Sequence, residues 1–200
     1  QRELVADDDL TQEERRYGKE VSGDLSALGL VGPDFDFVAE SSALDAAGVV
    51  GFYDQDAEEM VVRGEDLDDT DVRVTIVHEL THALQDQQFD LTELEDATDS
   101  SGAELALSSL VEGDATWVEE EFVASLPPAE QDAYYADAGS AAAEPELGTA
   151  SDQAFVLGLL FSAPYELGYW FVDFLRTGDS TRKLDAAFRE PPPSDEQILD

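Results

Sequence analysis

Most apolar residues of this chain recur at intervals of three or four, the spacing of helices that bury one face. Together with start and stop residues, this spacing predicts helices over 10–30, 36–47, 69–89, 101–126, 127–143 and 179–189. The stretch 154–175 is the most apolar. Because Pro164 cannot donate a backbone hydrogen bond inside a helix, we expect two core helices there, broken at Ser162-Ala163-Pro164.

Two short segments, Val49–Asp54 and Glu59–Arg63, have the composition of strands and are expected to form a hairpin. The acidic residues Asp54, Asp56 and Glu58 resemble a calcium loop, but they lack the glycine and the distal Glu of an EF-hand. We therefore expect a solvated turn. If the second strand is an edge strand, its free backbone groups can add a peptide strand; the alternative is that it only completes a small sheet.

These elements predict the α+β class, mostly helical, with a small β-sheet or hairpin before the helix at 69–89. Two hundred residues suit a single domain over 1–200 with one sizeable core. We expect a helical scaffold over 1–48, the hairpin and two chemistry-bearing helices over 49–122, and a helical C-terminal part over 123–200.

Acidic residues dominate the charge, because 48 Asp and Glu against 10 Lys and Arg give a formal net charge of −38. Such a chain repels nucleic acid and anionic membranes, so both are poor partners. A hydrophobic content of 42% still suits a globular protein. Since the carboxylates are spread along the chain, the composition favours a protein from a halophile over an acidic interaction module.

Both histidines of the chain lie in one short segment, His78-Glu79-Leu80-Thr81-His82. On a helix, residues four apart lie one turn apart on the same face, so both imidazoles can reach one metal ion. Glu79 can then take a proton from a water molecule at the metal. These are the parts of a zinc hydrolase. Apolar residues flank the segment on several faces, so we expect this helix to be buried over much of its girth.

A catalytic zinc needs a third protein ligand, and without further His or Cys it must be a carboxylate or a carbonyl. Glu112 is the best candidate, because small residues surround it on the next predicted helix and let two helices approach closely. These neighbours are Ser108, Ser109, Gly113, Ala115 and Thr116. Glu104 on the same helix is the main competitor.

The motif H-E-L-T-H, followed after a short connection by V-E-G-D-A-T, resembles the gluzincin branch of the zincin metallopeptidases. The specific part of the resemblance covers residues 49–122. It implies a zincin-like fold, Zn2+ bound by His78, His82 and Glu112, and Glu79 as the general base. It also implies that a peptide or protein substrate lies along an edge strand just before the H-E-x-x-H helix.

One position departs from this pattern. Thermolysin-like gluzincins carry an Asp one turn beyond the ligand Glu, where this chain has Thr116. The second nitrogen of a ligand imidazole needs a hydrogen-bond partner, and Glu119 or a backbone carbonyl can supply it.

An oxyanion that develops on a substrate needs a hydrogen-bond donor. We take Tyr165 as the catalytic candidate for this role. Tyr169 and Arg63 are further candidates. Packing with a structural hydrogen bond is the alternative for both tyrosines.

The sequence thus predicts an enzyme, a zinc metallopeptidase that hydrolyses peptide bonds through a metal-activated water with a Glu general base. The alternative is a non-catalytic, acidic partner-binding module with a structural or vestigial metal site.

The apolar stretch 154–175 is long enough to span a bilayer, but Glu166, Asp173 and Pro164 argue against direct membrane insertion. The chain begins at Gln1 and not at Met, which leaves a cleaved leader, a membrane anchor or an arbitrary boundary open. An exported or cell-surface location in a high-salt organism is favoured over a cytoplasmic one.

Overall fold

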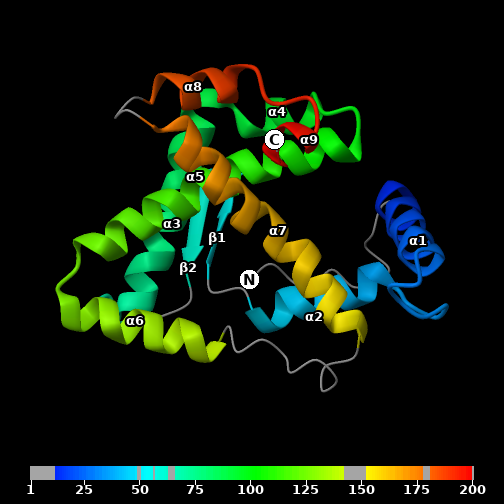
Figure 1. Ribbon diagram of the computed structural model, residues 1–200, viewed down its shortest axis with the longest axis horizontal. Helices are drawn as coiled ribbons and strands as arrows, with labels where there is room; N and C mark the ends of the chain where they lie inside the picture. Colours follow the sequence, from blue (N-terminus) through cyan, green and yellow to red (C-terminus); the bar gives the residue numbers. More distant parts are fainter. Residues whose placement is uncertain are drawn as a thin grey trace. The chain divides into compact units, whose positions relative to one another are not determined.

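The structure, a computed structural model, describes residues 12–48, 51–55, 57–62, 66–141, 152–177 and 181–199. The elements, shown in Figure 1, are α1 (Gln12–Ala27), α2 (Phe37–Gly48), β1 (Gly51–Asp54), β2 (Glu59–Val62), α3 (Thr70–Phe89), α4 (Leu91–Asp96), α5 (Ser101–Ser125), α6 (Pro128–Ala141), α7 (Asp152–Leu175), α8 (Arg182–Arg189) and α9 (Glu196–Leu199). Helices dominate, and one antiparallel strand pair precedes α3, which confirms the α+β class and the mostly helical content.

The chain divides into two compact units, which we describe separately. The first contains α1, α2 and the part of α7 up to Phe161. Its core consists of four buried side chains: Leu25, Val31, Phe35 and Leu157. The ring of Phe37 meets that of Tyr17 edge-on and stacks on that of Phe161, with centroid distances of 6.1 and 6.3 Å. The grouping into one domain stays a prediction.

The second unit contains β1, β2, α3 to α6, α7 from Ser162 onward, α8 and α9. Within it, α3 packs against α5, α4, α6 and both strands. The core consists of five buried side chains from α4, α5, α7 and α8: Leu91, Leu110, Val172, Leu184 and Phe188. Phe89, the last residue of α3, stacks on Phe188 with a centroid distance of 4.6 Å. This contact fixes the end of α3 to the core.

The predicted hairpin forms, with Gly51 opposite Val62 at its open end. At the turn, the side chain of Asp54 accepts a hydrogen bond of 3.0 Å from the backbone N–H of Ala57. An Asp side chain that binds its own backbone in this way is typical of turns. Asp56 and Arg63, two residues of the predicted hairpin, lie outside the described residues.

Two contacts hold the hairpin against α3. The hydroxyl of Tyr53 in β1 donates a hydrogen bond of 2.9 Å to Asp86. Gly51 lies so close to α3 that a Cβ there would come within 2.6 Å of Cγ2 of Thr75. The strands therefore lie beside the part of α3 between Thr75 and Asp86, which carries both histidines.

α3 begins and ends where the sequence predicts. Asp69 caps the first turn, because its side chain accepts a hydrogen bond of 3.0 Å from the backbone N–H of Asp71. After Phe89, Asp90 adopts a left-handed conformation with φ 55° and ends the helix. The expected burial around most of α3 is wrong: Leu80 and Leu84 are 52% and 57% exposed. They lie on the face away from the histidines, which the described packing partners leave open.

α5 and α7 touch backbone to backbone in the second unit. A Cβ on Gly113 would lie 2.2 Å from the carbonyl carbon of Gly168, and one on Gly168 would lie 1.9 Å from the carbonyl oxygen of Ser109. Only glycine fits at such a contact. The small residues around Glu112 therefore allow α7 to approach α5 closely. α5 also packs against α3.

The predicted break in the apolar stretch is wrong, because α7 is one helix with Pro164 inside it. Proline in a helix interior costs about 3 kcal/mol. Packing on both sides outweighs this cost, since Leu157 lies in the core of one unit and Val172 in the core of the other. The segment Phe155–Leu175 is long and apolar enough, by length and composition alone, to cross a membrane. The expectation that it does not insert stays a prediction.

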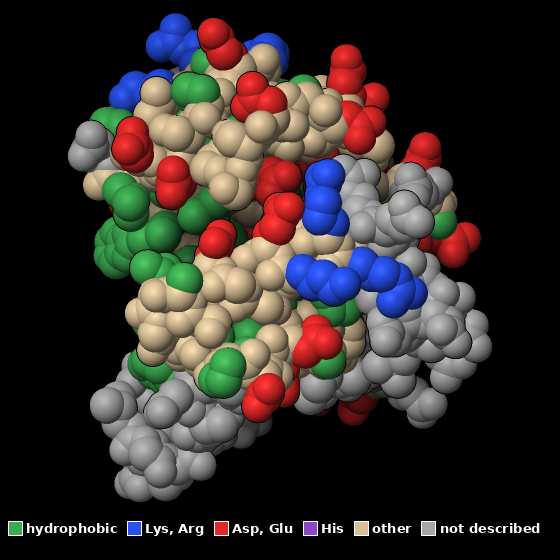
Figure 2. Space-filling model, turned by 90° about the vertical axis from the view of Figure 1, so that its right-hand side faces the viewer, with side chains coloured by type: hydrophobic (Ala, Val, Ile, Leu, Met, Phe, Trp, Pro, Cys, Tyr) green, Lys and Arg blue, Asp and Glu red, His purple; other side chains and the backbone are tan. Residues whose placement is uncertain are grey.

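The distribution of charged side chains can be seen on one face of the described part of the chain. On the face drawn in Figure 2, Asp and Glu side chains are scattered, whereas Lys and Arg gather in a few places. This distribution agrees with the spread of carboxylates along the sequence.

Candidate metal centre

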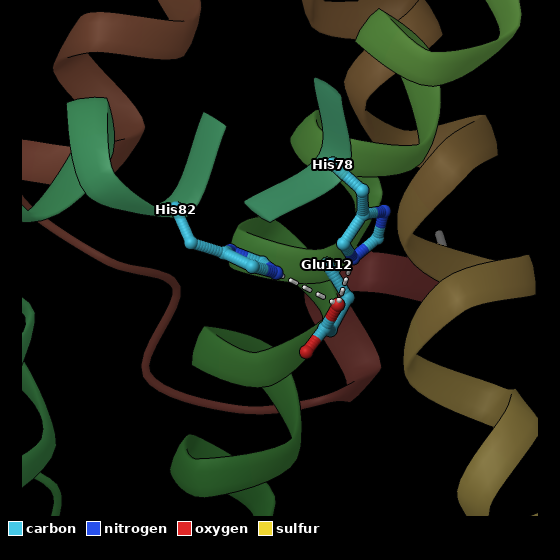
Figure 3. A group of neighbouring side chains, drawn as sticks. All are labelled: His78, His82 and Glu112. Atoms are coloured by element: carbon cyan, nitrogen blue, oxygen red, sulfur yellow. Dashed lines mark hydrogen bonds and ion pairs between the residues drawn. The ribbon is translucent and has the colours of Figure 1, made fainter. Parts of the chain in front are cut away.

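His78 and His82 lie one turn apart on α3, with ring centroids 4.7 Å apart, and Glu112 reaches them from α5. Oε2 of Glu112 lies 3.2 Å from Nε2 of His78 and 3.4 Å from Nε2 of His82. Figure 3 shows the three side chains pointing toward one another. Their ligand atoms all lie within 4.8 Å of one another, so the group could hold a metal ion. No other group of this kind occurs in the part of the chain that the structure describes.

The charges of these side chains stabilise one another. Burial by itself would lower the pKa of His78, but hydrogen bonds with Glu112 and Glu119, and the charges of both, raise it to about 9. Burial by itself would raise the pKa of Glu112, but the two histidines lower it to about 2. The carboxylates of this group therefore stabilise a positive charge at the point where the three side chains meet.

The second nitrogen of His78 faces a carboxylate. Its Nδ1 lies 3.0 Å from Oε2 of Glu119, one of the two partners left open by the sequence. The other oxygen of Glu119 accepts a hydrogen bond of 2.7 Å from the hydroxyl of Tyr134 in α6. Thr116 does not take this role, because its hydroxyl is buried and has no hydrogen-bond partner among the described residues.

The second nitrogen of His82 faces an amide that the sequence analysis did not identify. Its Nδ1 lies 3.0 Å from Oε1 of Gln85, one turn further along α3. Nε2 of Gln85 donates to the carbonyl of Val111 and to Oδ2 of Asp114, both at 3.0 Å. Oδ1 of Asp114 in turn lies 3.1 Å from the guanidinium of Arg176. The spacing of Gln85 from His82 on one helix face is the signal that could have revealed it.

Glu79, the predicted general base, is only 7% exposed. Burial raises its pKa, whereas the charges of His82 and His78 act in the opposite direction. The backbone of Tyr53 in β1 also forms a hydrogen bond with this carboxylate. Glu79 is therefore coupled electrostatically to the group formed by His78, His82 and Glu112.

Tyr165 of α7 lies beside the group formed by His78, His82 and Glu112. Its ring stacks on that of His78, with centroids 6.0 Å apart and planes 23° apart. Burial raises the pKa of its hydroxyl, as do the charge of Glu112 and a hydrogen bond with it. The hydroxyl therefore stays protonated at neutral pH and can donate.

The remaining candidates are not brought into this group. Tyr169 meets Trp170 edge-on at 5.3 Å, and burial and the charge of Asp173 raise its pKa. Glu104, the competitor of Glu112, is exposed near the start of α5. Arg63 lies outside the described residues.

Comparison of the chain with protein-family models, with curated proteins and with solved structures gives no match.

Proposed function

We propose that this chain is a zinc-dependent peptidase of the gluzincin kind, with His78, His82 and Glu112 as ligands and Glu79 as the general base. The observation that supports it most strongly is the convergence of two imidazole Nε2 atoms on one carboxylate oxygen. Each imidazole has its Nδ1 engaged with another side chain, which leaves the Nε2 lone pairs for a metal.

The donor set fits zinc. Zinc–nitrogen and zinc–oxygen bonds of about 2.1 Å in tetrahedral geometry place ligand atoms about 3.4 Å apart. The nitrogen–oxygen distances from Glu112 to His78 and His82 are 3.2 and 3.4 Å. Two imidazoles with one carboxylate are also the ligands of several catalytic zinc sites. A zinc ion held there would supply Lewis acidity, which polarises a carbonyl and makes water more acidic.

The residues around the ligands supply the proton transfers. Glu79 takes a proton from the attacking water and delivers it to the leaving nitrogen of the peptide bond. Its raised pKa suits both steps, because a weaker acid is a stronger base and the proton must be held between the two transfers. Tyr165 donates a hydrogen bond to the substrate oxygen on which negative charge develops.

The substrate that fits this arrangement is a peptide added to the hairpin. Sheet edges offer unpaired backbone groups that bind extended peptides with little regard to sequence. The sequence pointed to the second strand, β2, as this edge. We now favour β1, because its residue Tyr53 contacts the Glu79 carboxylate.

The test is metal content and hydrolysis measured on the same samples, purified in molar salt without chelator. We expect about one zinc per chain by mass spectrometry, lost in His78→Ala and in His82→Ala. Glu79→Gln should keep the zinc and lose the hydrolysis of casein. Wild type without zinc, or an active Glu79→Gln, would overturn the proposal. Zinc without any hydrolysis would favour the non-catalytic module.

A further inference from the structure

We propose that Gln85, held in place by Asp114 and Arg176, is the positioning residue that orients His82 so that its Nε2 faces the metal. This role rests on the proposed function, because it requires a metal at the site. Neither motif of the resemblance contains Gln85 or Arg176.

The hydrogen bonds around Gln85 allow only one orientation of its amide. Two acceptors, the carbonyl of Val111 and a carboxylate oxygen of Asp114, lie at 3.0 Å on one side, so the NH2 group must face them. The amide oxygen then faces Nδ1 of His82 at 3.0 Å. An oxygen can only accept, so Nδ1 must carry the proton and Nε2 must present its lone pair to the metal.

Asp114 is itself fixed from a third helix. It is buried, and its second oxygen lies 3.1 Å from the guanidinium of Arg176, just beyond the end of α7. The guanidinium lies over the ring of Trp117, 3.8 Å from its centroid. The orientation of His82 therefore depends on residues of α3 and α5 together with Arg176, which directly follows α7.

The charge of the site explains why an amide stands next to His82. Glu79, Glu112 and Glu119 already place three carboxylates around the histidines. A fourth carboxylate in contact with His82 would add repulsion between like charges in a largely buried site. A neutral amide orients the ring without that cost, and the negative charge of Asp114 stays one step away, paired with Arg176.

The test uses Co2+ as the probe, because its visible spectrum reports ligand geometry independently of turnover. Gln85→Leu keeps the approximate size of the side chain and removes the acceptor. We expect it to weaken Co2+ binding about 10- to 100-fold and to change the spectrum. Gln85→Glu should also weaken binding, because the new carboxylate faces Asp114. Gln85→Glu combined with Asp114→Asn removes the repulsion between these two carboxylates, so it should recover part of the affinity lost in Gln85→Glu.

Asp173→Asn is the matched control. Asp173 is an exposed residue of α7 that accepts a hydrogen bond of 3.3 Å from Trp117 but touches neither Gln85 nor Asp114. It should leave the affinity and the spectrum unchanged. Thermal unfolding of the metal-free variants distinguishes the positioning role of Gln85 from a purely structural one. A purely structural role would lower the stability of the variants and leave the Co2+ affinity of the folded protein unchanged.

The outcomes separate the two proposals. Wild-type affinity in Gln85→Leu, or a double variant no better than Gln85→Glu alone, would overturn the positioning role while the peptidase proposal stands. A wild-type chain that binds no Co2+ would overturn both. Co2+ binding with the expected variant pattern, but without peptide hydrolysis, would support the positioning role and overturn only the peptidase.

Discussion

Nδ1 of His78 lies 3.0 Å from Oε2 of Glu119, about two turns along α5 from Glu112. One helix therefore supplies a carboxylate to each nitrogen of the same imidazole, since Glu112 faces Nε2. The pair holds His78 in one ring orientation and increases the basicity of the nitrogen that would bind a metal.

Replacing Glu119 by Gln should weaken zinc binding about 10- to 100-fold, because the negative partner of His78 is lost. Zinc affinity measured by competition with a chelating dye gives the result. The control is Glu121→Gln, which removes the same charge from an exposed position on the same helix. Equal losses in both variants would show that only the total charge matters.

Zinc binding near pH 7.5 should release about one proton per zinc. The pKa of His78 is raised to about 9, so its ring is protonated at this pH and must lose the proton to become a ligand. Titration calorimetry in phosphate and in Tris, which differ in ionisation enthalpy, measures this proton. The release should disappear above about pH 10, and no release at pH 7.5 would contradict the expectation.

The same pKa shift makes the stability of the metal-free protein depend on pH. Because the pKa of His78 is raised from 6.5 to about 9, its contribution is fully present below pH 6.5 and is lost as the pH rises through 9. The shift corresponds to about 3 kcal/mol at most. Urea unfolding of the metal-free protein at pH 6 and pH 10 should show this loss, and His78→Gln should reduce it.

Gly168→Ala should destabilise the protein by several kcal/mol, because the new methyl group would lie 1.9 Å from the carbonyl oxygen of Ser109. It should also reduce hydrolysis, since α7 carries Tyr165 one turn before the contact. Gly158→Ala, on the same helix with nothing within 4 Å, is the control and should be neutral or stabilising by up to about 1 kcal/mol. Similar thermal unfolding of both variants would argue against the helix contact.

Tyr165→Phe should lower kcat about 100-fold, because the donor to the developing oxyanion is removed while the stacking ring remains. Zinc content should be close to that of the wild type. Tyr169→Phe serves as the matched control and should be fully active, since Tyr169 packs against Trp170. If Tyr165→Phe instead loses zinc at unchanged kcat per bound metal, Tyr165 serves to hold Glu112.

The protein should loosen or unfold below a few tenths molar salt. A net charge of −38 repels itself, and a screening length of about 3 Å at 1 M salt removes most of that repulsion. Circular dichroism during a NaCl titration, with sucrose of equal osmolality as the control, gives the answer. An unchanged spectrum in dilute buffer would contradict the halophilic interpretation.

The features of this protein that depend on interactions between neighbouring residues could be predicted from its sequence. Helical periodicity places His78 and His82 on one face, a capping residue predicts the start of α3 at Asp69, and polar residues predict its end near Phe89. The hairpin follows from strand composition and a polar turn. Each of these features depends on interactions within a few residues, so the local sequence is sufficient.

The sequence left Glu104 open as a competitor of Glu112, and only the tertiary structure decided that Glu112 faces both histidines. In the sequence, Gln85 is only one of several polar residues at the end of a helix. The tertiary structure brings it into contact with Asp114. The continuity of α7 through Pro164 was decided in the same way. These features depend on which helices pack together, and packing joins residues far apart in the chain through contacts that no local pattern encodes.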